Sequence, residues 1–212
     1  MDDFLDELDA VRREVGNRDD ARVVVLRREY AAAIDDVWDA VTNPQRIPRW
    51  FLPVSGDLRL GGRYQIEGNA GGEILQCEPP SLLRISWIFG EPVEDAFSEV
   101  AVRLAPAGDR RTTLELEHVA TVPAEQWPTY GPGAVGVGWD LTLLGLAVHL
   151  RGGSMDDSGG AEAWSMSPEG RRFITTSSEA WGEASVANGA KPDEAAVAVG
   201  NTTAFYTGTE QT

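Results

Sequence analysis

Residues 138–150 read GWDLTLLGLAVHL, an apolar stretch of helical length. Apolar side chains recur along it at helical spacing in two stripes. The first stripe is Trp139, Leu143, Leu146 and Leu150, and the second is Leu141, Leu144 and Val148. A helix that is apolar on two sides must be covered on two sides. Since one sheet covers only one side, the sequence predicts two different partners for this helix.

The segment before this helix predicts the first partner. From residue 54 to 119 apolar and polar residues alternate, and turns rich in glycine and proline interrupt the pattern. This alternation is typical of an antiparallel meander with one solvated face. A valine-rich segment at 22–30 predicts one more strand. The fold class predicted is therefore α+β, with a sheet packed on the long helix.

The tail predicts the second partner. Ser167 is suited to cap a helix with Pro168 at its first position, and Asn188-Gly189 is suited to end it. A second helical stretch starts at Pro192. The tail is too aromatic for a disordered segment, with Trp164, Phe173, Trp181, Phe205 and Tyr206. We expect a helical pair that covers the second stripe, either in its own chain or in a second subunit as a swapped dimer.

The N-terminus predicts an amphipathic helix that docks on the body of the protein. Phe4, Leu8, Val11 and Val15 share one helical face. The expected organisation is an N-terminal helix at 1–20, a central domain at 21–151 and a helical C-terminal extension at 152–212.

Composition excludes several classes of partner. The 212 residues carry a formal net charge of −16. Such a charge argues against binding nucleic acid or an anionic membrane surface. The single cysteine allows no internal disulfide, and the acidic N-terminus does not resemble a signal peptide. We expect a cytoplasmic monomer or homodimer.

A glycine motif at 131–136 has the spelling G-x-G-x-x-G of a dinucleotide site. It fails the structural requirement, because no predicted strand precedes it and no parallel strand follows the helix. Two histidines and one cysteine are too few for a structural zinc site. The sequence therefore predicts no cofactor and no metal, and the glycines are expected to allow a tight approach into the helix.

Five segments resemble a known family: VWDAVTNPQRIPRWF at 37–51, LRLGGRYQIEG at 58–68, GEILQCEPPSLLRISW at 72–87, TLELEHV at 113–119 and GW at 138–139. They resemble the SRPBCC superfamily, also called START-like or helix-grip, in its branch of activators of the heat-shock-protein-90 ATPase. The resemblance covers about residues 22 to 150. It implies a curved antiparallel sheet wrapped around the long helix, with a cavity between them.

Alternation assigns residues to that cavity. The inward-facing positions predicted on the sheet are Tyr64, Ile66, Leu83, Ile85, Trp87, Phe89, Val102, Leu114, Leu116 and His118. Trp139 and Leu143 are expected to face it from the helix, and Trp50 and Phe51 to lie near its mouth. An aromatic-lined cavity with few polar groups is typical of a small-molecule site.

The resemblance leaves three functions open. The first is a non-catalytic domain that binds a hydrophobic or amphipathic small molecule. The second is a co-chaperone-like or regulatory domain of the bacterial single-domain type, whose partner is a chaperone or regulator in a stress response. The third is a cyclase-like enzyme using His118, Tyr64 and Arg84. His118 is either a structural residue bonded to the loop at 120–137, or a ligand anchor or general base.

Overall fold

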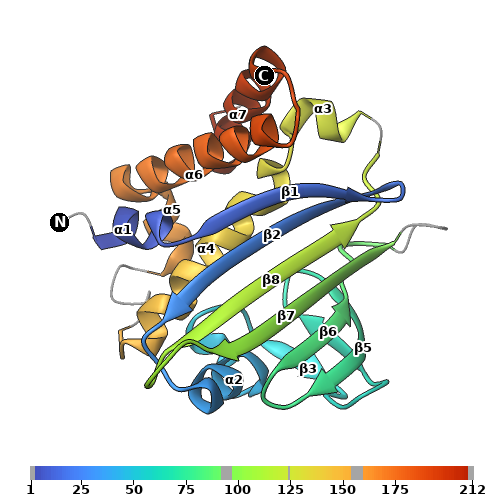
Figure 1. Cartoon of the computed structure of the whole chain (residues 1–212), viewed down its shortest axis with the longest axis vertical. Coiled ribbons are helices and arrows are strands. Elements are labelled where there is room, and N and C mark those ends of the chain that lie inside the picture. Colours follow the sequence, from blue (N-terminus) through green and yellow to red (C-terminus); the bar gives the residue numbers. More distant parts are fainter. Residues whose placement is uncertain (1–2, 92–96, 124, 154–159, 210–212) are drawn as a thin grey trace.

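The computed structural model describes residues 3–91, 97–123, 125–153 and 160–209 (Figure 1). The elements before the long helix are α1 (Asp3–Asp9), β1 (Arg12–Arg18), β2 (Ala21–Tyr30), α2 (Ile34–Thr42), the 3₁₀ helix η1 (Ile47–Arg49), β3 (Val54–Gly56), β4 (Arg63–Ile66), β5 (Gly71–Glu78), β6 (Leu82–Ser86), β7 (Ser98–Pro106), β8 (Thr112–Ala120) and α3 (Gln126–Tyr130). Then follow α4 (Gly133–Leu150), α5 (Ala161–Met166), α6 (Pro168–Ala187) and α7 (Pro192–Thr207).

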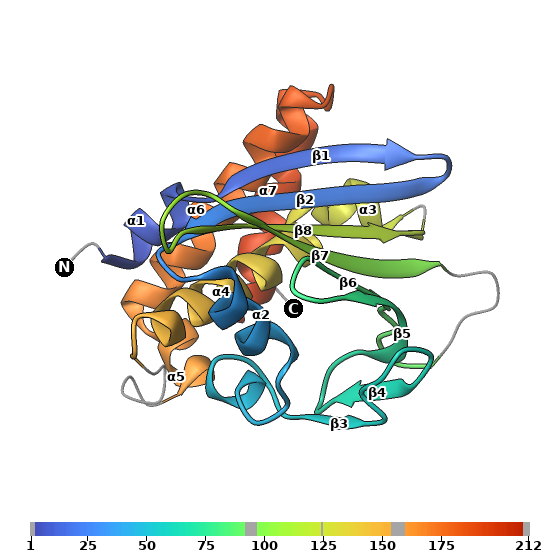
Figure 2. The same ribbon diagram turned by 60° about the horizontal axis from the view of Figure 1, so that its bottom comes forward.

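Within these residues the strands form one eight-stranded sheet in the order β1-β2-β8-β7-β6-β5-β4-β3, and every neighbouring pair is antiparallel. The sheet curls from β1 to β3, with α2 and α4 inside the curve (Figure 2). This arrangement confirms the α+β helix-grip fold that the alternation and the resemblance predict.

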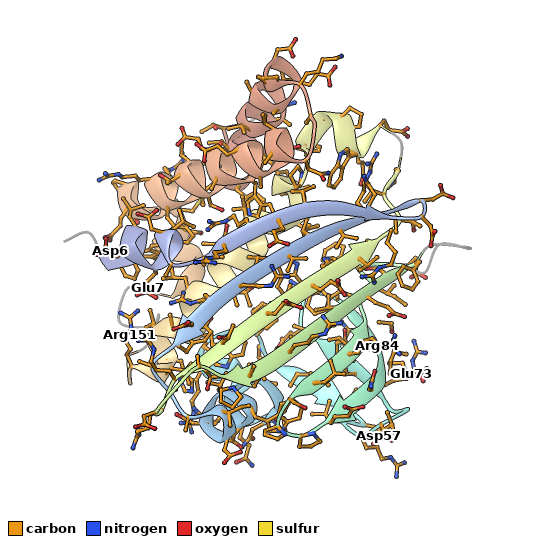
Figure 3. All side chains as sticks on the ribbon, in the orientation of Figure 1. Asp6, Glu7, Asp57, Glu73, Arg84 and Arg151 are labelled. Carbon is orange, nitrogen blue, oxygen red and sulfur yellow. The ribbon has the colours of Figure 1, made fainter. Side chains whose placement is uncertain are left out.

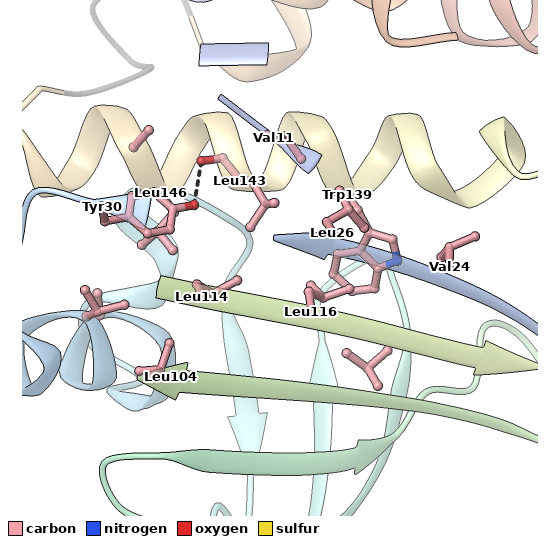
Figure 4. Close-up of a cluster of buried hydrophobic side chains, with 14 of the residues drawn as sticks. Val11, Val24, Leu26, Tyr30, Leu104, Leu114, Leu116, Trp139, Leu143 and Leu146 are labelled. Carbon is pink, nitrogen blue, oxygen red and sulfur yellow. Dashed lines mark hydrogen bonds between the residues drawn. The ribbon is translucent and has the colours of Figure 1, made fainter. Parts of the chain in front are cut away.

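The concave face of the sheet holds the first stripe of α4. Trp139, Leu143 and Leu146 are buried there against residues of β2 and β8, including Leu26, Leu114 and Leu116 (Figure 4). The Tyr30 hydroxyl donates to the Leu143 carbonyl oxygen at 3.1 Å. By length and composition α4 would suffice to cross a membrane, but 56% of it is buried within the protein, as in the core helix of a globular domain.

The second stripe of α4 is covered by both ends of its own chain. Leu144 is buried with Leu8 of α1, Trp164 of α5 and Phe173 of α6, and Leu141 and Val148 pack against this cluster. Ser167 accepts a hydrogen bond from the Gly170 amide as the N-cap of α6, with Pro168 at its start, and Asn188 caps its C-terminal end. In the structure, α1 and the helices α5 and α6 of the tail thus lie over this stripe.

The predicted helix at 1–20 is wrong beyond its first residues. Helix α1 ends at Asp9, and residues 12–18 form β1, the edge strand that pairs with β2. Val11 and Val15 are four residues apart, a spacing that places side chains on one face of a strand as well as of a helix. Pairing with β2 satisfies the backbone of this segment, while Val11 and Val15 still reach the core.

Charged residues hold α1 in place. Glu7 forms ion pairs with Arg28 of β2, at 2.6 Å, and with Arg151, which follows α4. Figure 3 shows Glu7 and Arg151 next to each other beside this helix. The short helix thus bridges the first long strand and the end of α4.

The glycine-rich segment 131–138 receives the C-terminal helices. A Cβ atom on Gly136 would lie 2.2 Å from the Trp181 ring of α6, and one on Gly133 would lie 3.0 Å from the Thr202 side chain of α7. Helix α4 starts at Gly133, five residues before the Gly138-Trp139 pair at which we expected it to open. The glycines therefore allow close helix packing, because they let α6 and α7 of the tail lie directly against the start of α4.

Candidate functional site: a two-part cavity under the long helix

Two cavities lie between the sheet and α4. The larger, which we name the outer cavity, has a volume of about 760 Å³, and the smaller, which we name the inner cavity, has a volume of about 180 Å³. They share four wall residues, Phe51, Trp87, Trp139 and Thr142. The rings of Trp87 and Trp139 lie 4.9 Å apart between their centroids. We call these four residues the septum, because they separate one aromatic-lined space into two.

The structure places all fourteen residues assigned to the cavity on the wall of one space or the other. Twelve of them line the inner cavity: Trp50, Phe51, Tyr64, Ile66, Leu83, Ile85, Trp87, Val102, Leu114, Leu116, Trp139 and Leu143. Phe89 and His118 line only the outer cavity. The structure thus gives the position of all fourteen residues, and their role in holding a ligand remains a prediction.

The larger cavity has a wall that sequence reasoning missed. Arg22, Ser98, Ala120, Trp127, Phe205 and Tyr206 line it together with residues of α3 and α4. Ser98 and Ala120 continue the inward alternation of β7 and β8 by one step, so a longer reading of the pattern would have found them. Phe205 and Tyr206 come from α7, and only the aromatic content of the tail hinted at them.

His118 is a fixed part of this wall. Its Nδ1 atom accepts a hydrogen bond from the Trp139 indole at 3.2 Å, and its Nε2 atom lies 3.0 Å from the Ser98 hydroxyl oxygen. An indole nitrogen only donates, so Nδ1 carries the lone pair and Nε2 carries the proton. Burial lowers the pKa of His118 to about 4. The ring is therefore neutral near pH 7, and its lone pair is already used.

These contacts correct two predictions about His118. Among the described residues its partners are Ser98 and Trp139, and none of the described residues of the loop at 120–137 is bonded to it. The role of general base loses its support, because the nitrogen that would take a proton already accepts from Trp139. His118 instead positions the Trp139 ring of the septum.

Tyr64 and Arg84 do not join His118 in a common site. The Tyr64 hydroxyl donates to the Ser86 carbonyl oxygen at 2.7 Å, and burial strongly raises the pKa of Tyr64. Arg84 lies on the outer face of the sheet (Figure 3), where it pairs with Glu99 at 3.5 Å. The proposed catalytic set is thus divided between the two faces of the sheet.

Over the described part of the chain, no cluster of three or more histidine, cysteine, aspartate or glutamate side chains is placed to hold a metal ion.

The outer cavity has an apolar, exposed rim. Phe89, Phe97, Val135 and Phe205 belong to its wall and are exposed large apolar side chains. Arg22 is the only cation of the described wall; it donates to the Asn17 side chain at 2.6 Å and lies over the Trp127 ring at 4.9 Å. The opening therefore favours apolar molecules, and its one cation already has partners.

Solved structures resemble most of this chain. The crystal structure of CalU16 from Micromonospora echinospora is 38% identical, with a TM-score of 0.65, and the match covers 82% of this chain and 98% of that one. The solution structure of the same protein is 40% identical, with a TM-score of 0.67, and covers 85% and 97%. DynU16, described as a putative protein in the dynemicin biosynthetic locus, is 25% identical, with a TM-score of 0.52, and covers 62% of this chain and 48% of that one.

Among curated proteins, none matches significantly. A family model described as activator of Hsp90 ATPase homolog 1-like protein matches residues 31–151. This range includes the strands β3 to β8 and all of α4. The chain therefore belongs to the family of activator of Hsp90 ATPase homolog 1-like proteins.

Proposed function

We propose that this chain is a non-catalytic binding domain that holds a hydrophobic or amphipathic small molecule in the outer cavity. The carrying observation is the cavity itself, about 760 Å³ in volume and open at an apolar rim. Ligand pockets commonly measure about 300–1,000 Å³ and are lined by apolar and aromatic side chains with few polar groups. The proposal includes the cytoplasmic location that the sequence predicts.

The tail takes part in this site. Phe205 and Tyr206 of α7 line the outer cavity together with Trp87 and Trp139. The Tyr206 hydroxyl donates to the Ala134 carbonyl oxygen of α4 at 2.9 Å, which fixes the ring against the long helix. Residues outside the range of the family match thus complete the proposed ligand site.

A place in the biosynthetic locus of a natural product, as described for DynU16, is consistent with a protein that binds a small molecule.

A library of apolar and amphipathic compounds, screened by thermal shift and native mass spectrometry, tests the proposal. Val135 lies on the rim of the cavity, whereas Val197 of α7 is an exposed valine outside it. V135E and V197E add the same charge, so only the first is expected to weaken binding of a compound that stabilises the wild type. Absence of any stabilising compound, or equal loss in both variants, contradicts the proposal.

The family match supports a second candidate, a regulatory partner of a heat-shock-protein-90-type chaperone. This function uses the protein surface and does not need the cavity. Adding the purified chain to such a chaperone tests it, with the rate of ATP hydrolysis as the measurement. Stimulation that persists in V135E separates this function from ligand binding.

A further inference from the structure

The outer cavity contains a hydroxyl group whose hydrogen has no acceptor in the described structure. Because Trp139 donates to His118 Nδ1, His118 Nε2 must donate to the Ser98 oxygen. Ser98 thus accepts from His118, and its own O–H hydrogen remains available. The chain of hydrogen bonds has one direction, from Trp139 through His118 to Ser98, and it ends in a donor at the cavity wall.

Three other hydroxyl groups on the same wall donate within the protein. Tyr206 donates to the Ala134 carbonyl, Thr142 to the Gly138 carbonyl at 2.8 Å, and Thr121 to the Phe97 carbonyl at 3.2 Å. In contrast, Ser98 lines the cavity, and its hydroxyl hydrogen has no acceptor among the described residues. A donor inside an apolar site favours a ligand that carries an acceptor, since an unpaired polar group is costly to bury.

The position of Ser98 locates this acceptor. The Ser98 carbonyl accepts from the Trp87 amide at 2.8 Å, and His118 lies edge-on to the Trp139 ring at 5.8 Å. Ser98 is therefore bonded to the backbone of Trp87 and, through His118, linked to Trp139, so it lies on the side of the outer cavity that faces the septum. An oxygen bound there belongs to a molecule whose apolar body extends from the septum toward Phe205 and Tyr206.

The charge at this point distinguishes between acceptors. His118 is neutral near pH 7, and Arg22, the cation of the described wall, lies on the far side of β8, where Ala120 stands between it and Ser98. A carboxylate next to Ser98 would be buried without a counter-ion, which costs more than burying a carbonyl group. We propose that Ser98 is a specificity-determining residue that donates a hydrogen bond to the carbonyl oxygen of a neutral aromatic ligand.

This inference rests on the proposed function, and a pair of fluorescent probes separates the two. Prodan is a neutral aromatic ketone whose emission moves to longer wavelength when its carbonyl accepts a hydrogen bond. N-phenyl-1-naphthylamine is apolar and has no carbonyl group. Both probes are expected to bind the wild type. S98A is expected to weaken prodan binding about fivefold, the effect of one hydrogen bond of about 1 kcal/mol, and to shift its emission to shorter wavelength.

The control outcomes are distinct. S98A should leave the affinity for N-phenyl-1-naphthylamine unchanged, and S98T should restore prodan binding because it keeps the hydroxyl. Equal prodan affinity and emission in wild type and S98A overturn the inference while leaving the proposed function intact. Failure of both probes to bind the wild type overturns the proposed function, and the inference with it.

One measurement needs no variant. Nitrogen NMR of the wild-type protein reports which ring nitrogen of His118 carries the proton. The Nε2–H tautomer is expected. A proton on Nδ1 would leave no acceptor for the Trp139 indole and would make Ser98 the donor to Nε2, which overturns the inference even if S98A folds poorly.

Discussion

Arg13 and Asp140 form a buried ion pair that joins the edge strand β1 to the long helix. Two guanidinium nitrogens of Arg13 donate to the two carboxylate oxygens, at 3.0 and 2.9 Å. The same carboxylate accepts from Ser177 at 2.6 Å and from the Trp181 indole at 3.0 Å, both on α6. Burial raises the pKa of Asp140, and these donors stabilise its charged form. One side chain thus connects the N-terminal strand, the central helix and the tail.

Removing the cation should be costly. R13Q leaves Asp140 buried without its counter-ion, so the free energy of unfolding should fall by about 3–5 kcal/mol at pH 7. Arg18 of the same strand pairs with Glu117 on the exposed side of the sheet, and R18Q should cost at most about 1 kcal/mol. Urea unfolding of the three proteins measures both values. Similar losses in the two variants would mean that the buried pair has no special role.

The packing of α6 on α4 depends on Gly136. G136A would place a methyl group 2.2 Å from the Trp181 ring, so we expect a loss of about 2 kcal/mol or more in stability. A Cβ atom on Gly200 of α7 would instead point into open space, and G200A should stabilise its helix by about 0.5–1 kcal/mol. Thermal unfolding should move the two melting temperatures in opposite directions. A stable G136A would show that α6 is not held closely.

His118 should make the stability depend on pH. Its pKa is about 4 in the folded protein and about 6.5 when unfolded, so the unfolded chain binds more protons between these values. Stability due to the neutral ring is complete above pH 6.5 and is lost as the pH falls through this window, by at most about 3 kcal/mol. Urea unfolding from pH 4 to 7 measures the slope, which H118Q should reduce.

The other histidine provides the control for this experiment. His149 is half-buried beside Arg46, at 3.2 Å, and burial also lowers its pKa. H149Q retains the hydrogen bonds of His118, so most of the slope should remain. If H149Q reduces the slope of the free energy of unfolding against pH more than H118Q does, the pH dependence arises from His149 and its contact with Arg46 instead.

The septum should limit the length of ligand that the site accepts. W87A removes one of its rings and should connect the inner cavity of about 180 Å³ with the outer one. The lauroyl analogue of prodan carries a long chain on its carbonyl group, which would then extend past Trp139 into the inner cavity. Its affinity relative to prodan should rise in W87A. Trp127 lines only the outer cavity, so W127A should not change this ratio.

Alternation along β4 to β8 was enough to identify the concave face. It requires only that successive side chains of a strand point to opposite faces, which is local geometry. For the same reason the two stripes of α4 predicted the need for a second cover, and the aromatic tail predicted where it comes from. Local spacing failed at residues 12–18, where a step of four fits a strand and a helix equally well, and only pairing with β2 decides between them.

The sequence by itself determined the sheet, its inward face, the long helix and the helical tail, because hydrophobic periodicity is a property of neighbouring residues. Only the tertiary structure decided the chemistry of the site. It brings His118 next to Ser98 and Trp139, fixes the direction of their hydrogen bonds, and divides the cavity at Trp87. It also sets the tail against Gly136 and makes α7 part of the wall. These relationships join residues far apart in the chain, and a local sequence pattern does not predict how close such residues lie in space.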